Sequence, residues 1–304
     1  MVGPGRRCPN CELATTSETR LIRLASDGLP ARVSGAWTQE KLVYVERYAT
    51  AFMRAMAPKK KQGKWENLIY IDLLAGPGLG INRDTEGQFE GSPLRALRVS
   101  PPFDHLYFGD LKRQNVIALE RRIPRQDRAR VTLQVGDCNE LAKTIVRKLS
   151  GRELGLAFVD PQGFEATFEM FRALSTRRID ILYLFPGGIG VTRNLSAFAR
   201  GAGRQLDALW GGSGWRDLRK VRIASGKGLS NEELRSRDEP FLLSFRQRLA
   251  TLGFRYSDEG EPYFTNEKNV KMYHLLYFSK DPAGLTLWRN VRHIEPSGQR
   301  TLPF

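Results

Sequence analysis

The chain has 304 residues, of which 41% are hydrophobic, and this is enough for one large α/β domain with additions or for two domains. Its net charge of +15 favours a polyanionic partner, most often nucleic acid, although a basic surface can also serve solubility alone. No apolar run is long enough to span a membrane, and three cysteines without a disulfide framework favour a reducing compartment. We therefore expect a cytoplasmic protein with no membrane partner.

The pattern along the chain changes at two points. Residues 1–36 mix glycine, proline, serine and arginine with little periodicity, so we expect a flexible basic arm. From Trp37 to Met56 the apolar residues recur at helical spacing, which predicts an amphipathic helix within a helical extension over residues 37–66. Pro58 is expected to end that helix. Residues 67–300 are expected to form the main domain, with a helical insertion at about residues 192–255.

From residue 68 onward, apolar strand-like runs alternate with helical segments. The runs predicted to be strands are residues 68–74, 105–110, 130–137, 154–160 and 179–185. Near-continuous apolar strands separated by helices imply an α/β fold with a mostly parallel sheet and helices on both faces. Two later runs, residues 263–265 and 272–279, are predicted to form an antiparallel pair at an edge of this sheet.

The most informative stretch follows the first predicted strand, where a carboxylate is succeeded by a glycine-rich turn. The stretch consists of Asp72, Leu73, Leu74, Ala75, Gly76, Pro77 and Gly78. Glycine lacks a Cβ, so backbone N–H groups in such a turn can approach a ligand closely. A purely structural corner between a strand and a helix would explain the same residues.

Three more predicted strands end at acidic residues, namely Asp110, Asp137 and Asp160. Parallel strands in an open sheet end at one edge, and ligands bind in the crevice outside that edge. We therefore expect these carboxylates and Asp72 to surround a common cleft.

These features together resemble class I S-adenosylmethionine (SAM)-dependent methyltransferases. More narrowly, the chain resembles the three-Cys-motif partner protein family through Asp72–Gly78, Gly91–Leu94, Phe158–Gly163, Phe185-Pro186 and the Trp210–Trp215 region. The resemblance covers roughly residues 38 to 290. It implies a Rossmann-like methyltransferase sheet, SAM as the cofactor, and a radical-SAM enzyme with a three-cysteine motif as a candidate partner.

The resemblance also implies roles for the residues of the cofactor site. Ala75, Gly76, Pro77 and Gly78 would pass under the methionine and ribose parts of SAM, and Asp72 would contact its amino acid end directly or through water. Asp110 would accept hydrogen bonds from the ribose hydroxyls, and Asp137 from the adenine amine, with Cys138 near the ring. The alternatives are that Asp110 and Asp137 only cap helices and that Cys138 is a small buried hydrophobic residue.

Asp160, Pro161 and Gln162 would face the transferred methyl group and the nucleophile, with Asp160 orienting or deprotonating that nucleophile. Methyltransferases that act on base amines commonly carry Asp/Asn-Pro-Pro-aromatic here, and Gln162 departs from that pattern, so amine methylation stays open. Cytosine-C5 chemistry is excluded because it needs a thiolate after a proline beyond the fourth strand. A ribose 2′-O mechanism needs two lysines and two acids, of which Lys41 and Asp160 could supply half.

Three residues outside these motifs are candidates for binding substrate. Arg193 and Asn194 could hold a phosphate, although a solvated surface also explains them, and Lys268 lies in an aromatic-rich segment that could stack bases. Cys8 and Cys11 have half the spacing of a zinc site without a second pair, so no metal is expected. The sequence therefore predicts a SAM-dependent methyltransferase acting on nucleic acid or a nucleotide. The alternative is a non-catalytic partner protein that binds nucleic acid or a radical-SAM enzyme.

Overall fold

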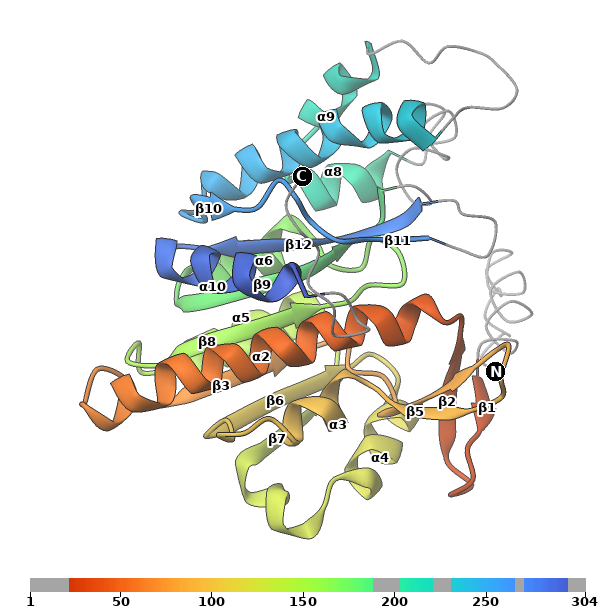
Figure 1. Ribbon diagram of the computed structural model, residues 1–304, viewed down its shortest axis with the longest axis vertical. Helices are drawn as coiled ribbons and strands as arrows, with labels where there is room; N and C mark the ends of the chain where they lie inside the picture. The colour runs from red at the N-terminus through yellow and green to blue at the C-terminus, as the bar shows by residue number, and fades with distance from the viewer. Residues whose placement is uncertain (1–21, 188–202, 221–230, 266–270, 295–304) are drawn as a thin grey trace, which may run out of the picture.

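The computed structural model describes residues 22–187, 203–220, 231–265 and 271–294 (Figure 1). An eight-stranded sheet with the order β10–β12–β9–β8–β3–β6–β7, in which β11 pairs with β12, forms its centre. The strands of this sheet are β3 (Leu68–Asp72), β6 (His105–Asp110), β7 (Val131–Val135), β8 (Leu154–Val159), β9 (Arg178–Phe185), β10 (Tyr256–Ser257), β11 (Tyr263–Thr265) and β12 (Lys271–Ser279).

The central sheet is mostly parallel, as the sequence predicts. The pairs β3–β6, β3–β8, β6–β7 and β8–β9 are parallel, whereas β12 runs antiparallel to β9, β10 and β11. The predicted late antiparallel pair is confirmed by the register of Tyr263 opposite His274. The five parallel strands therefore end at one edge, which we call the carboxyl edge, and begin at the opposite one, which we call the far edge.

Helices cover both faces of this sheet, which confirms the expected α/β fold class. On one face lie α5 (Cys138–Lys148), α6 (Phe168–Ser175), α8 (Arg204–Trp210) and α9 (Asn231–Ala250). On the other lie α2 (Trp37–Lys61), α3 (Ser92–Leu97), α4 (Arg113–Arg122) and α10 (Pro282–Arg292). The short 3-10 helices η2 (Arg125–Arg130) and η5 (Gly214–Lys220) complete the described helical segments. None of the described helices has the length and hydrophobicity that a membrane span requires.

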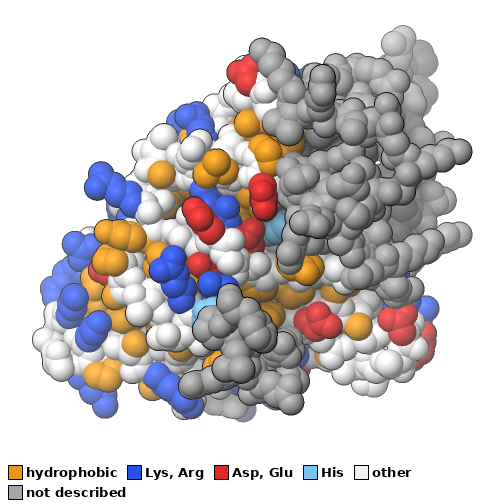
Figure 2. Space-filling model, turned by 45° about the horizontal axis from the view of Figure 1, so that its top comes forward, with side chains coloured by type: hydrophobic (Ala, Val, Ile, Leu, Met, Phe, Trp, Pro, Cys, Tyr) orange, Lys and Arg blue, Asp and Glu red, His pale blue; other side chains and the backbone are white. Residues whose placement is uncertain are grey.

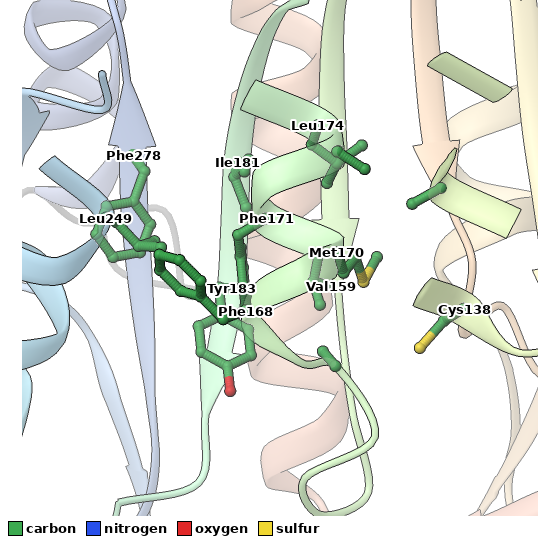
Figure 3. Packing of buried hydrophobic residues seen from close by; sticks show 14 of the residues in the cluster. Cys138, Val159, Phe168, Met170, Phe171, Leu174, Ile181, Tyr183, Leu249 and Phe278 are labelled. Atoms are coloured by element: carbon green, nitrogen blue, oxygen red, sulfur yellow. The ribbon is translucent and has the colours of Figure 1, made fainter. Parts of the chain in front are cut away.

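Aromatic side chains pack the helices α6 and α9 against the sheet (Figure 3). Phe171 of α6 lies against Tyr183 of β9, with ring centroids 5.1 Å apart. Phe245 of α9 is fully buried and contacts the rings of both residues, at 5.6 and 5.4 Å. Between β9 and β10 the described residues therefore form helices that complete the core of the main sheet.

The N-terminal part of the chain differs from the sequence prediction. We expected a flexible arm over residues 1–36, but residues 22–36 contain β1 (Ile22–Leu24) and β2 (Pro30–Ser34). β2 pairs in parallel with β4 (Leu79–Asn82), which in turn pairs with β5 (Gln88–Glu90) to complete a four-stranded second sheet. These strands are too short and mixed in polarity to stand out locally, and β2 pairs with a strand that is distant in sequence. Residues 1–21 lie outside the described residues.

The predicted N-terminal helix is present and longer than expected. α2 continues through Pro58 to Lys61, so Pro58 lies within its last turn instead of ending it. The apolar stripe of α2, which includes Leu42, Val45 and Phe52, is buried against the main sheet. Figure 1 shows α2 running along the sheet from the end near β2 to the opposite end of the molecule.

We expect Phe245→Ala to lower the free energy of unfolding by about 3–5 kcal/mol, because it removes a fully buried ring at the joint between α9 and the sheet. Leu243→Ala, on the same helix but 51% exposed, should change it by less than about 0.5 kcal/mol. Urea denaturation followed by circular dichroism measures both. Equal effects of the two substitutions would show that α9 does not pack as described.

Candidate functional site

The glycine turn after β3 lies at the carboxyl edge and adopts a conformation that glycine favours. Gly76 and Gly78 have φ angles of 64° and 90°, in the left-handed region. The Gly76 N–H donates to a carboxylate oxygen of Asp110 at 3.0 Å, and the Gly91 N–H donates to the Gly78 carbonyl at 2.8 Å. A Cβ on Gly76 would meet no atom within 4 Å, so it would project into open space. The turn is therefore fixed by its neighbours and leaves room beside Gly76.

Asp72 is fully buried at the end of β3. Its carboxylate accepts hydrogen bonds from the Ser92 hydroxyl at 2.6 Å and from the Leu74 N–H at 3.2 Å. Burial raises the pKa of Asp72 to about 7, against these hydrogen bonds, and the nearby charge of Asp160 adds to the rise. Asp72 does not line the cleft described below, whereas Ser92, to which it is hydrogen-bonded, does.

The residue that follows β8, Asp160, forms an ion pair with Lys41 of α2. The Lys41 Nζ and an oxygen of Asp160 are 2.5 Å apart, and the two side chains are only 2% and 13% exposed. Burial lowers the pKa of the Lys41 ammonium, although the Asp160 carboxylate opposes this shift. Burying such a pair costs several kcal/mol of desolvation per ion, so stability alone explains it poorly.

The glycine turn and this ion pair line one narrow cleft of about 50 Å³. The predicted residues that line it are Ala75, Gly76, Pro77, Gly78 and Asp160. The sequence analysis missed the residues that complete it from other elements, namely Arg32, Ser34, Thr38, Phe89 and Ser92. Arg32 and Ser34 were assigned to a flexible arm, and only the parallel pairing of β2 with β4 brings them to the turn.

Asp110 and Asp137 occupy different positions relative to this cleft. Asp110 bonds the turn through Gly76 and also accepts from the Lys112 N–H at 2.8 Å, so it supports the turn from the end of β6. Asp137 is exposed and caps α5, accepting from the N–H groups of Asn139 and Glu140. Of the four carboxylates expected around a common cleft, only Asp160 lines it. Asp72 and Asp110 lie beside the turn and Asp137 caps α5, so the four do not surround the cleft as expected.

Cys138 is buried, and its thiol contacts the Glu165 carbonyl at 3.5 Å. Burial raises the pKa of this thiol to about 12, so it remains neutral at physiological pH. It has the environment of the small buried hydrophobic residue that the sequence analysis offered as the alternative.

The remaining predicted site residues lie away from the cleft or outside the described residues. Pro161 is buried and Gln162 is exposed, and neither lines the cleft. Arg193, Asn194 and Lys268 lie outside the described residues, so their predicted role in substrate binding stays a prediction.

Aromatic side chains lie next to the ion pair. The Lys41 ammonium is 4.9 Å from the centroid of the Trp37 ring, which stacks on Tyr273 of β12 at 4.8 Å. Phe264 of β11 packs against Trp37 at 6.4 Å. Lys41 therefore lies between the Asp160 carboxylate and an aromatic cluster made of Trp37, Phe264 and Tyr273.

No protein-family model and no curated protein matches this sequence. Among solved structures, a Legionella pneumophila protein of the family model DUF519 is 13% identical with a TM-score of 0.44, and the match covers 81% of this chain and 89% of that chain. The N-terminal domain of EvdMO1, crystallised in the presence of S-adenosylhomocysteine (SAH) and D-fucose, is 10% identical with a TM-score of 0.44, covering 90% and 97%.

A third similar structure is magnesium protoporphyrin IX methyltransferase from Synechocystis PCC 6803 with bound SAH. It is 13% identical with a TM-score of 0.36, and the match covers 79% of this chain and 85% of that chain. All three TM-scores are low, so the ligands of this chain have to be inferred from its own residues.

The raised pKa of Asp72 predicts a pH-dependent difference between the wild-type protein and Asp72→Asn. Between the ordinary carboxyl pKa near 3.8 and the folded value of about 7, the folded protein holds a proton that the unfolded chain has lost. Relative to Asp72→Asn, the wild-type free energy of unfolding should therefore fall by up to about 1.4 kcal/mol per pH unit over this range and level off above it.

Urea denaturation of both proteins at several pH values from acidic to mildly alkaline measures this difference, since other titrating groups cancel in the comparison. Parallel pH curves for the two proteins would rule out a raised pKa at Asp72.

Proposed function

We propose that this protein is a SAM-dependent methyltransferase that acts on nucleic acid or a nucleotide and binds SAM in the cleft at the carboxyl edge. The open space beside Gly76 supports this, because a ligand can approach the turn where a side chain would otherwise lie. The cleft of about 50 Å³ is smaller than pockets that hold ligands of this size, which start at roughly 300 Å³. SAM binding therefore requires lining side chains such as Phe89 and Lys41 to move.

The observation that carries the proposal is the buried Lys41–Asp160 pair beside the glycine turn. A costly buried ion pair that lines a cleft, with a lysine whose pKa is lowered by burial, is the kind of arrangement that prepares groups for proton transfer. Lys41 and Asp160 are also one of the two lysines and one of the two acids that a ribose 2′-O mechanism needs.

The reaction needs in-line positioning and removal of one proton. SAM supplies an electrophilic methyl group bound to a sulfonium. A hydroxyl or amine of the substrate attacks the methyl carbon, the carbon–sulfur bond breaks, and SAH leaves. Asp160 would orient the attacking group and accept the proton that this group loses, and Lys41 would hold the Asp160 carboxylate in place.

The class of substrate is argued from the surroundings of the pair. Trp37 places an aromatic ring next to Lys41 and stacks on Tyr273, and aromatic rings are the platforms on which unpaired bases stack. The net charge of +15 favours a phosphate-bearing partner. A nucleotide base or its ribose is therefore the proposed acceptor.

One observation favours a second candidate function, a non-catalytic partner protein of the three-Cys-motif kind. Pro161 is buried and Gln162 is exposed away from the cleft, so the segment after β8 does not surround an acceptor amine with polar groups. Such a protein would bind SAM or nucleic acid, or a radical-SAM enzyme, without transferring a methyl group.

Gly76→Ala should weaken SAM binding at least about tenfold, because the new methyl group would project into the space proposed for the ligand. Gly151→Ala is the matched control, since Gly151 also has a positive φ, of 92°, and open space around its Cβ, but lies at the far edge. Isothermal titration calorimetry with SAM and with SAH measures both variants. Equal affinities, or no binding to the wild-type protein, would contradict the proposed cofactor site.

Asp160→Asn and Lys41→Met should each lower methyl transfer by about 10²-fold or more while leaving SAM bound. Each leaves one buried charge without its partner, so each is also expected to destabilise the fold. The double variant removes both charges and should regain stability without regaining activity, which separates the two effects.

The assay is transfer of a labelled methyl group from SAM to total cellular nucleic acid. Asp258→Asn is the control, because it disrupts the ion pairs of the buried Asp258 carboxylate with Arg289 and Arg292, outside the cleft. Methyl transfer retained by the double variant would show that Asp160 and Lys41 take no part in the reaction. SAM binding without any transfer by the wild-type protein would support the partner-protein function.

A further inference from the structure

A second and larger cavity, of about 440 Å³, lies at the far edge of the sheet. It is bounded by the end of α2, the starts of β8 and β9, and the segment that joins β12 to α10. Leu154, the first residue of β8, lines this far-edge cavity, whereas Asp160, just past the end of β8, lines the first cleft. The two positions are six residues apart along an extended strand, or about 20 Å. The far-edge cavity is therefore a separate site with the volume of an ordinary ligand pocket.

The wall of the far-edge cavity is apolar over much of its extent. Phe52 and Met56 contribute from α2, Leu287 from α10 and Ile179 from β9. Phe52, Met56 and Leu287 belong to the face of the sheet that α2 and α10 cover, whereas Ile179 belongs to the core of the opposite face. The cavity is therefore a gap at the edge of an otherwise packed layer. A ligand with an apolar body would find complementary contacts there.

Four cationic side chains line the same cavity without forming ion pairs among the described residues. One of them, Lys280, donates a hydrogen bond to the Ser175 carbonyl. The other three are Lys59, Lys64 and Arg178. Lys64 and Arg178 lie over the ring of Trp65, at 5.5 and 5.3 Å from its centroid. Figure 2 shows lysine and arginine side chains gathered at the left of the view, the end of the molecule at which α2 ends in Figure 1.

The carboxylates that line the cavity are already engaged by other groups. Asp180 accepts hydrogen bonds from the hydroxyls of Tyr48, Tyr277 and Ser279, at 2.9, 2.8 and 2.6 Å. Asp281 caps α10 by accepting from the Ala283 N–H at 2.9 Å. Neither carboxylate forms an ion pair with these cations among the described residues, and four cationic side chains outnumber the two carboxylates in the lining. An excess of positive charge therefore faces a partly apolar cavity.

We propose that the far-edge cavity binds a small organic anion, with its apolar body against Phe52, Met56 and Leu287 and its acidic group facing Lys59, Lys64 and Arg178. The ligand class is an aromatic or aliphatic body that carries one phosphate, sulfonate or carboxylate. This site is independent of the proposed methyl transfer, and its occupant need not be the cofactor or the substrate.

The test compares two fluorescent probes that differ in charge. Anilinonaphthalene sulfonate has an apolar body with one anionic group, and N-phenylnaphthylamine is its neutral analogue. The wild-type protein should bind the sulfonate at one saturable site, and more tightly than the neutral probe. The combined substitutions Lys59→Ala, Lys64→Ala and Arg178→Ala should weaken sulfonate binding at least about tenfold and leave the neutral probe unaffected.

A matched control removes three positive charges elsewhere. Arg121, Arg125 and Arg128 are exposed, and their combined replacement by alanine should leave binding of both probes unchanged. Met56→Trp should instead fill the cavity and weaken both probes. Circular dichroism checks that each variant is folded.

Equal loss of sulfonate binding in the two triple variants would overturn the proposal, since it would trace binding to net charge alone. Displacement of the sulfonate by SAH, or its unchanged binding to Met56→Trp, would overturn it as well, because the probe would then occupy another place.

Discussion

Polar contacts at three points along α2 hold this helix against the main sheet, and α2 lines both cavities. Lys41 pairs with Asp160 at the carboxyl edge, the Tyr48 hydroxyl donates to Asp180, and Lys60 pairs with Asp104 at the far edge. The helix has 25 residues and is therefore ~37 Å long, enough to extend along the sheet from one edge to the other. Because the same helix lines both cavities, its first turns shape the cleft and its last turns shape the far-edge cavity.

The sequence predicted the parts of the fold whose signal is local and strong. Residues 68–74, 105–110 and 154–160 were predicted as strands, and β3, β6 and β8 lie within one or two residues of those bounds. Buried parallel strands are apolar on both faces, so composition alone marks them. The second sheet was missed because β2 has only five residues, and its pairing with β4 depends on contacts across some fifty positions of sequence.

The site was predicted in part for the same reason. Gly76, Gly78 and Asp160 end or follow apolar strands, and parallel strands bring such positions to one edge. Lys41 was named with Asp160 as half of the set that a ribose 2′-O mechanism needs, and its burial against that carboxylate, 119 residues away, was not predicted. Helical periodicity separates polar from apolar positions, but it does not distinguish a lysine that faces solvent from one that faces a buried acid. Arg32 and Ser34 required the unpredicted sheet.

The buried charges in and beside the cleft couple ligand binding to protonation. Burial raises the pKa of Asp72 to about 7 and lowers that of Lys41, because it disfavours the charged form of each group. A cationic ligand beside the turn would lower the pKa of each group further, since positive charge favours the ionised carboxyl and the neutral amine. Under the proposed function, a sulfonium beside the turn would therefore favour the ionised form of Asp72 and disfavour the charged form of Lys41, which its pairing with Asp160 stabilises.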